Sequence, residues 1–168
     1  ILDEEALLRA ATLVKENDGK LAIYRKAVDK FESQRAQYNI AVTYINMNEL
    51  SKAKNALSKV TEDADVYNAL GVIALREGDY NAAVRAFGDA KSNNAALAQI
   101  LVKDYNKART TLAAIPTPDA TTYYLLAVLG ARTNNQQMVT SNLRQSFRLD
   151  ANMRVVAAKD LEFAKFNI

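Results

Sequence analysis

The feature that most constrains this chain of 168 residues is an internal repeat with a period of 30 residues. Residues 37–60 (QYNIAVTYINMNELSKAKNALSKV) align without a gap on residues 67–90 (YNALGVIALREGDYNAAVRAFGDA). Both copies carry an apolar residue followed by a small one, then a polar turn, a small residue and a large apolar residue. Self-similarity at such a period is typical of chains that stack one supersecondary unit many times.

Two further copies follow towards the C-terminus. Residues 123–146 repeat the pattern, with Leu126-Ala127 in place of Leu70-Gly71 and with Asn134 in the turn. Residues 93–115 form a shortened copy, whose first half has lost about one helical turn. The repeat therefore organises most of the chain.

The spacing within each copy predicts two helices that pack closely against each other. The turn between them requires a positive φ, which Asn48, Gly78 and Asn134 tolerate, whereas Lys103 departs from this pattern. One pair of helices cannot bury both of its faces, so we expect the copies to stack into a solenoid. The small residues at the predicted crossings are Ala41, Gly71, Ala96 and Ala127 on first helices and Ala53, Ala83 and Ala108 on second helices, and the large residues that fill the gaps are Leu57, Phe87, Leu112 and Leu143.

The two ends of the chain extend this arrangement. The periodicity predicts helices over about 3–16 and 20–33, which Asn17-Asp18-Gly19 would separate, and a final capping helix over about 152–166. The prolines at 116 and 118 predict a loop before the last repeat. We therefore expect one domain over 1–168, made of helix hairpins at about 3–33, 34–62, 64–91, 93–115 and 120–149 and the capping helix.

Among the internal copies, residues 67–90 most strongly resemble the tetratricopeptide repeat (TPR). The residues that carry the resemblance are Tyr67, Leu70-Gly71, Ala74, Gly78-Asp79-Tyr80, Ala83, Phe87 and Ala90. The resemblance implies an all-α fold, a right-handed α-solenoid of helix hairpins with a C-terminal capping helix. It also implies a non-catalytic scaffold that presents a concave groove to a protein or peptide partner.

In TPR proteins the first helix of each hairpin lines the groove, so the resemblance also implies which residues would contact a partner. These residues are Tyr38, Val42 and Asn46, then Asn68, Val72 and Arg76, then Tyr124, Val128 and Arg132. The alternative is that the tyrosines pack between repeats and the arginines are solvated. The Lys and Asn pair that some family members use to hold a C-terminal carboxylate is absent, so we expect no chaperone-tail receptor.

The composition argues against catalysis and against metal or cofactor binding. The chain has no His and no Cys, which removes thiolate nucleophiles, common zinc ligands and the usual near-neutral general base. We interpret Asp79, Asp104 and Asp119 as turn or capping residues, and no glycine-rich phosphate loop occurs. We therefore expect no enzyme, no cofactor and no metal site.

A basic run lies near the C-terminus and comprises Arg132, Arg144, Arg148, Arg154 and Lys159. An anionic partner such as lipid headgroups, phosphate or an acidic protein could bind it. The alternative is a solvated convex face with cations near helix C-termini. The net charge of +3 is small and no reading helix occurs, so we expect no nucleic-acid partner.

The sequence says little about context. It begins at Ile1, shows no secretion signal and no apolar run long enough for a transmembrane segment, and we expect it to be part of a longer polypeptide. The closing AAKDLEFAKF resembles the end of repeat proteins from the Bacteroidetes envelope, some of which carry an OmpA-like module. This implies a location in the bacterial cell envelope, in the periplasm or at the outer membrane, with the cytoplasm as the alternative. A structural spacer and a self-association module remain alternative functions.

Overall fold

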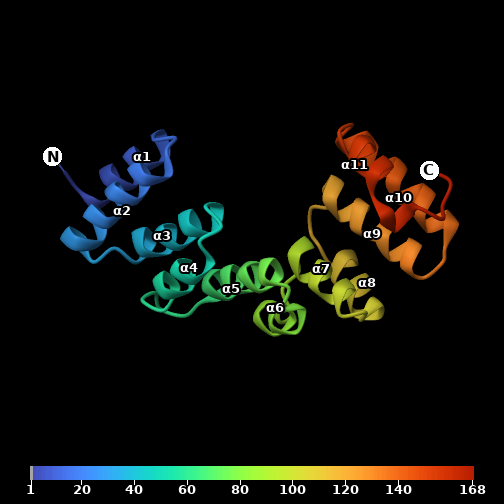
Figure 1. Cartoon of the computed structure of the whole chain (residues 1–168), viewed down its shortest axis with the longest axis horizontal. Coiled ribbons are helices and arrows are strands. Elements are labelled where there is room, and N and C mark those ends of the chain that lie inside the picture. The colour runs from blue at the N-terminus through green and yellow to red at the C-terminus, as the bar shows by residue number, and fades with distance from the viewer. Residues whose placement is uncertain (1) are drawn as a thin grey trace. The chain divides into compact units, whose positions relative to one another are not determined.

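A computed structural model describes residues 2–168, and every regular element in that range is helical (Figure 1). The fold is the all-α, TPR-like solenoid that the repeat predicts. The α-helices are α1 (Glu4–Leu13), α2 (Asn17–Phe31), α3 (Gln34–Asn46), α4 (Leu50–Leu57), α5 (Ala64–Glu77), α6 (Tyr80–Phe87), α7 (Asn93–Leu101), α8 (Tyr105–Ala113), α9 (Ala120–Arg132), α10 (Gln136–Leu149) and α11 (Met153–Lys159), and a 3₁₀ turn, η1, covers Leu161–Phe163.

The chain divides into two compact units, which we call unit 1 (residues 1–77) and unit 2 (residues 78–168). The boundary falls inside the predicted hairpin 64–91, so that α5 belongs to unit 1 and α6 to unit 2. The packing of that hairpin and the organisation of 1–168 as one domain therefore remain predictions.

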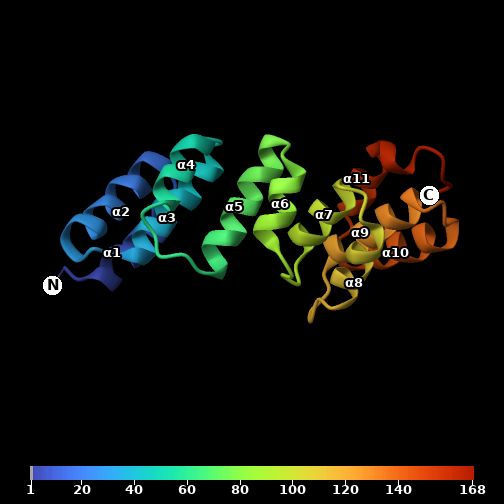
Figure 2. The same ribbon diagram turned by 90° about the horizontal axis from the view of Figure 1, so that it is seen from below.

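In unit 1, consecutive helices pack side by side, from α1 on α2 to α3 on α4 (Figure 2). Ala41 and Ala53, the small residues predicted at the α3–α4 crossing, are completely buried, and Leu57 packs in the same core. The Ser33 hydroxyl accepts a hydrogen bond from the Ala36 N–H at 3.0 Å and so caps the N-terminus of α3. The repeat pattern therefore places the crossings correctly in this unit.

The first hairpin differs from the prediction at its turn. Asn17-Asp18-Gly19 is the first turn of α2, and the chain leaves α1 earlier, at the extended residue Val14. A Cβ atom on Gly19 would lie only 2.7 Å from Val14 Cγ1, so glycine serves close packing here. Asp18 also suits the positive end of the α2 dipole. The prediction of a break at 17–19 was wrong because these residues can also start a helix.

In unit 2, the last hairpin pairs α9 with α10 along most of their length. A Cβ atom on Gly130 would lie 2.9 Å from Met138 Cβ and 3.0 Å from the Val139 backbone nitrogen. Val139 is completely buried where the other copies carry alanine, so the glycine on the facing helix makes room for it. Asp119 and Thr122 form a capping box at the start of α9, after the loop that the prolines predict.

Each repeat turn contains one residue with a positive φ. Asn48, Gly78 and Asn134 have φ values of 59°, 78° and 56°, as the sequence predicts. Lys103 also has a positive φ, of 67°, although lysine tolerates this region poorly. The shortened repeat therefore keeps the turn geometry of the others at a cost of roughly 1–2 kcal/mol in backbone strain.

The C-terminal helix is shorter than predicted. Helix α11 ends at Lys159, and Asp160 has an extended backbone. The Asp160 carboxylate accepts a hydrogen bond from the Glu162 N–H at 2.9 Å and so starts η1 in a new direction. A single helix over 152–166 is therefore wrong, because an N-capping residue interrupts it. Among residues 2–168 no helix has the length and apolarity that crossing a bilayer requires.

Candidate functional site

The predicted groove residues lie on the first helices of three hairpins, at intervals of four residues. In unit 1, Asn46, Asn68 and Arg76 are exposed, and the remaining three, Tyr38, Val42 and Val72, are half-buried. In unit 2, Tyr124 and Val128 are only 8% and 7% exposed, and Arg132 is half-buried. Positions that are equivalent in sequence therefore differ in their exposure to solvent.

Arg76 and Arg132 make the same backbone contact. Arg76 Nη1 donates to the Ile45 carbonyl at 2.7 Å, and Arg132 Nη1 donates to the Ile100 carbonyl at 3.3 Å. Ile45 and Ile100 hold equivalent positions in the last turns of α3 and α7, and each carbonyl also accepts a backbone hydrogen bond at 2.9 Å, from Asn48 or Lys103 in the following turn. Each arginine therefore joins its own first helix to the preceding one, a role that neither sequence alternative included.

The face of α9 that carries Tyr124, Val128 and Arg132 is covered by residues 160–163, which we call the C-terminal strap. The Tyr124 hydroxyl donates to Asp160 Oδ2 at 2.5 Å. The Phe163 ring meets the Tyr124 ring edge-on, with ring centroids 5.5 Å apart. Phe163 is 2% exposed and packs in one buried cluster with Val128.

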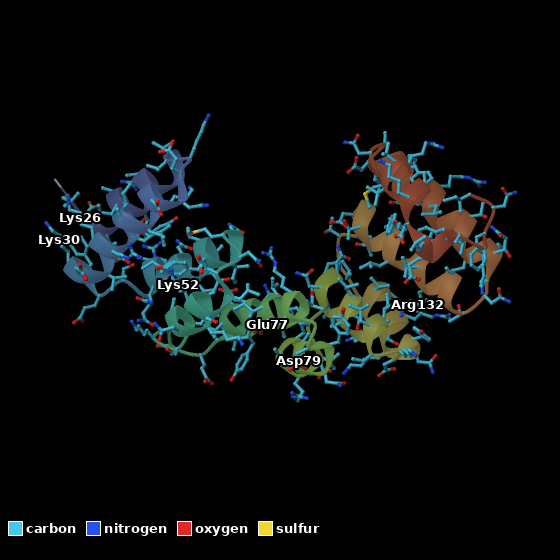
Figure 3. The ribbon with its side chains drawn as sticks, viewed as in Figure 1. Lys26, Lys30, Lys52, Glu77, Asp79 and Arg132 are labelled. Carbon is cyan, nitrogen blue, oxygen red and sulfur yellow. The ribbon has the colours of Figure 1, made fainter. Side chains whose placement is uncertain are left out.

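Arg132, at the C-terminal end of α9 in Figure 3, binds the strap through Glu162. Its Nε lies 3.0 Å and 3.1 Å from the two Glu162 carboxylate oxygens, and its Nη2 lies 2.6 Å from Oε1. This fork matches the planar geometry of a carboxylate. The hydrogen bonds to Glu162 raise the pKa of the Arg132 guanidinium above its ordinary value.

The tyrosines of the predicted groove sit in different surroundings. Burial, followed by the hydrogen bond to Asp160, raises the pKa of the Tyr124 phenol well above its ordinary value of 10.0. Burial, followed by the charges of Asp65 and Asp63, raises the pKa of Tyr38. Tyr38 lines a cavity of about 230 Å³ in unit 1 together with Asp63 and Asp65. The Tyr38 site therefore presents an aromatic wall beside two carboxylates.

The structure separates the members of the basic run. Arg144, Arg148 and Arg154 line a cavity of about 500 Å³ beside Phe147, and the Arg154 guanidinium lies 4.8 Å from the centre of that ring. Arg132 is instead engaged by Glu162 on the α9 face. The run is therefore not one continuous patch.

The acidic residues considered for catalysis act as helix caps. Asp79, Asp104 and Asp119 accept backbone hydrogen bonds from Ala82, Lys107 and Thr122 at the starts of α6, α8 and α9. Hydrogen bonds, first of all from the Thr122 N–H, lower the pKa of Asp119. Within the described residues 2–168, no group of three or more acidic side chains is arranged to hold a metal ion.

The sequence analysis missed the strap residues Asp160, Glu162 and Phe163. An available signal was Asp160 itself, a strong N-capping residue inside the predicted helix. The two acidic residues beyond the last repeat, whose first helix ends in Arg132, were a second signal. Neither indicated that the segment returns to α9, because that contact joins residues 30 or more positions apart.

Comparison with known proteins supports the assignment of two of the repeats. A family profile described as "Tetratricopeptide repeat" matches residues 34–62 and 64–96. Comparison with curated protein sequences gives no match.

Three solved structures share the fold at low sequence identity. The YrrB structure, "a TPR protein with an unusual peptide-binding site", has a TM-score of 0.63 at 20% identity and covers 95% of this chain and 93% of its own. A tetratricopeptide repeat protein from Parabacteroides merdae has a TM-score of 0.70 at 15% identity, over 93% of this chain and 69% of its own. The APC/C hetero-tetramer Cut9–Hcn1 has a TM-score of 0.73 at 19% identity over 82% of this chain, which spans only 31% of the matched chain.

Proposed function

Because residues 34–62 and 64–96 are tetratricopeptide repeats, we propose that this chain is a non-catalytic scaffold that binds a peptide segment of a protein partner on the first-helix face of unit 1. The observation that carries the proposal is the exposure of Asn46, Asn68 and Arg76 on that face. The equivalent positions in unit 2 bind the chain's own C-terminal strap. The exposed side chains of such a face can determine which ligand binds, while the helices that carry them keep the same fold.

The chemistry of the face suits an extended or helical segment. Asn46 and Asn68 supply amide donors and acceptors, which can pair with a partner's backbone. Arg76 uses Nη1 for the Ile45 carbonyl and carries further donors in the same plane. Tyr38 adds an aromatic wall, and Tyr and Arg are the residues that most often anchor interfaces. Stacking of the repeats holds the face rigid, so little ordering cost falls on the binding step.

The relatives support the same class of function. YrrB is described as a TPR protein with a peptide-binding site, and Cut9–Hcn1 is a protein assembly. Both share the fold with this chain at 20% identity or less. Peptide binding by unit 1 is therefore our proposal for this chain.

A selection from a random peptide display library against the purified chain tests the proposal. We expect the selected peptides to bind the Arg76→Glu variant about tenfold or more weakly than the parent chain, because an arginine that a bound partner buries is often a hot spot of the interface. Lys30→Glu makes the same charge change at an exposed position of α2 and should leave the affinity unchanged. Circular dichroism checks that both variants stay helical. Equal affinity for the chain and for Arg76→Glu would contradict the proposal.

Two alternatives predict other results. A structural spacer within a larger cell-envelope protein would select no peptide on this face. A self-association module would sediment as a dimer or larger species at high concentration, whereas the scaffold remains a monomer. The envelope location and the OmpA-like module stay predictions from the C-terminal sequence.

A further inference from the structure

The C-terminal strap contacts α9 as a bound ligand would, through three side chains that alternate in chemistry. Asp160 accepts from the Tyr124 hydroxyl, Glu162 pairs with Arg132, and Phe163 is buried against the Tyr124 ring. Between them, Leu161 is 88% exposed and faces away from the site. The strap therefore presents the pattern Asp-x-Glu-Phe to the α9 face, whose positions are equivalent to those of the proposed binding face in unit 1.

From these contacts we infer that the α9 face is a binding site for acidic–aromatic segments of the pattern Asp-x-Glu-Phe, which the strap occupies until a partner segment displaces it. This inference goes beyond the proposed function, which concerns unit 1, to the equivalent face of unit 2, and it specifies the chemistry of the ligand there. The partner needs one carboxylate for the Tyr124 hydroxyl, one for the Arg132 fork and an aromatic ring for the wall between them.

The strap is built so that it can leave without unfolding the hairpin. Helix α11 ends before it at Lys159, and the extended backbone of Asp160 provides a hinge between the two. η1 is only three residues long, and the residues after Phe163 contact the hairpin through two hydrogen bonds between Gln136 and Asn167, at 3.2 Å and 3.4 Å, and through the partly buried Phe166. Displacement of the strap would expose Phe163, and the aromatic ring of a partner segment can replace this contact while the α9–α10 hairpin stays folded.

Charge also favours an acidic ligand. Arg132 is the only member of the basic run that a carboxylate engages among residues 2–168. If the strap leaves, the Arg132 guanidinium loses its carboxylate partner, and a carboxylate of the incoming segment can take the place of Glu162 in the same fork. A segment without a carboxylate at this position would therefore bind poorly.

The tethered strap competes with any partner at a high effective concentration. A substitution that weakens the strap but leaves the site intact should therefore strengthen binding of a peptide added in trans. Glu162→Gln meets this condition, because Glu162 belongs to the strap and Arg132 remains in place. Glu77→Gln is the matched control, since it removes the same charge from an ion pair with Lys54 in unit 1.

The experiment measures fluorescence anisotropy of a labelled peptide with the sequence of residues 159–166, KDLEFAKF, added to the full chain and its variants. We expect Glu162→Gln to bind this peptide about fivefold or more tightly than the parent chain, as relief of an occupied site predicts. Hydrogen-exchange mass spectrometry should show faster exchange over residues 160–168 in Glu162→Gln and no change in Glu77→Gln. A peptide with Gln in place of its Glu should bind at least about tenfold more weakly, because it leaves Arg132 unpaired.

A second variant tests the contact between the ligand and Tyr124. Tyr124→Phe keeps the ring but removes the hydroxyl that bonds Asp160. Combined with Glu162→Gln, which releases the strap, it should lower affinity for the peptide severalfold relative to Glu162→Gln alone, and it should abolish the difference between that peptide and one with Asn in place of Asp.

Three outcomes would overturn the inference. The first is no peptide binding to Glu162→Gln, which would make the strap a permanent cap. The second is equal binding of the Glu and Gln peptides. The third is dimerisation of Glu162→Gln by sedimentation, which would make a second copy of the chain the occupant. Each outcome leaves the test on Arg76 in unit 1 unaffected, so the two proposals fail separately.

Discussion

Arg76 and Arg132 hold the same position in two copies of the repeat, and both donate to a backbone carbonyl of the preceding first helix. Within the part of the chain that the structure describes, a carboxylate reaches Arg132 and none reaches Arg76. The α9 face is buried under the C-terminal strap, whereas the α5 face exposes Asn68 and Arg76. The comparison shows that equivalent repeat positions can be buried in one copy and exposed in another, depending on whether a distant segment of the chain covers them.

Substitution of Phe163, the buried aromatic residue of the strap, should have the largest effect on the stability of unit 2. We expect Phe163→Ala to lower the free energy of unfolding of unit 2 by roughly 3–5 kcal/mol, because the side chain is buried and leaves a cavity. Urea denaturation followed by circular dichroism measures the change. Leu161→Ala, at the exposed neighbour, is the matched control and should change stability by less than about 0.5 kcal/mol. Equal effects of the two substitutions would show that the strap does not pack on α9 as described.

Stability should be nearly as sensitive to a substitution in the α9–α10 hairpin beneath the strap. Gly130→Leu places a side chain against Met138 and the Val139 backbone, so we expect a loss of about 1–3 kcal/mol from overpacking. Thermal denaturation measures it, with Ala158→Leu at an exposed position of α11 as the control. A Gly130→Leu variant as stable as the parent would contradict the close α9–α10 crossing.

The two arginines themselves give the most direct comparison. Arg76→Gln loses one hydrogen bond from a charged donor, and we expect it to destabilise by about 1 kcal/mol. Arg132→Gln also loses the Glu162 pair, so we expect about 2 kcal/mol. Chemical denaturation of both variants in one buffer measures the difference. A larger effect at Arg76 would reverse the assignment of the occupied and the open face.

High pH should affect the α9 face through Tyr124. The folded protein holds the pKa of this phenol above its ordinary value of 10.0, because burial and the Asp160 carboxylate disfavour the phenolate. The neutral phenol therefore stabilises the fold fully below pH 10, and this contribution is lost as the pH rises through the raised folded value. Tyr124→Phe should show a smaller loss of stability above pH 10 than the parent chain. Identical pH profiles for the two proteins would show that Tyr124 is solvated.

Local sequence was sufficient for the elements whose determinants lie within one hairpin. The small residues Ala41 and Ala127 are completely buried, and the turn residues Asn48 and Asn134 have positive φ. Asp119 caps α9, where the loop after the prolines predicts a helix start. These features depend on neighbours a few positions away, so their spacing in the sequence carries the information. The exception at residues 17–19 arose because the same residue types suit both a break and a helix start.

The sequence by itself determined the repeat, its turns, its crossings and the helices that carry the candidate face. Only the tertiary structure decided which copy of that face is covered, because the strap meets α9 across 30 or more positions of chain. Arg76 and Arg132 hold equivalent positions in the repeat, and neither position by itself indicates whether a distant segment covers it. The distinction depends on where Glu162 lies in space, which follows from the end of α11 at Lys159 and the burial of Phe163.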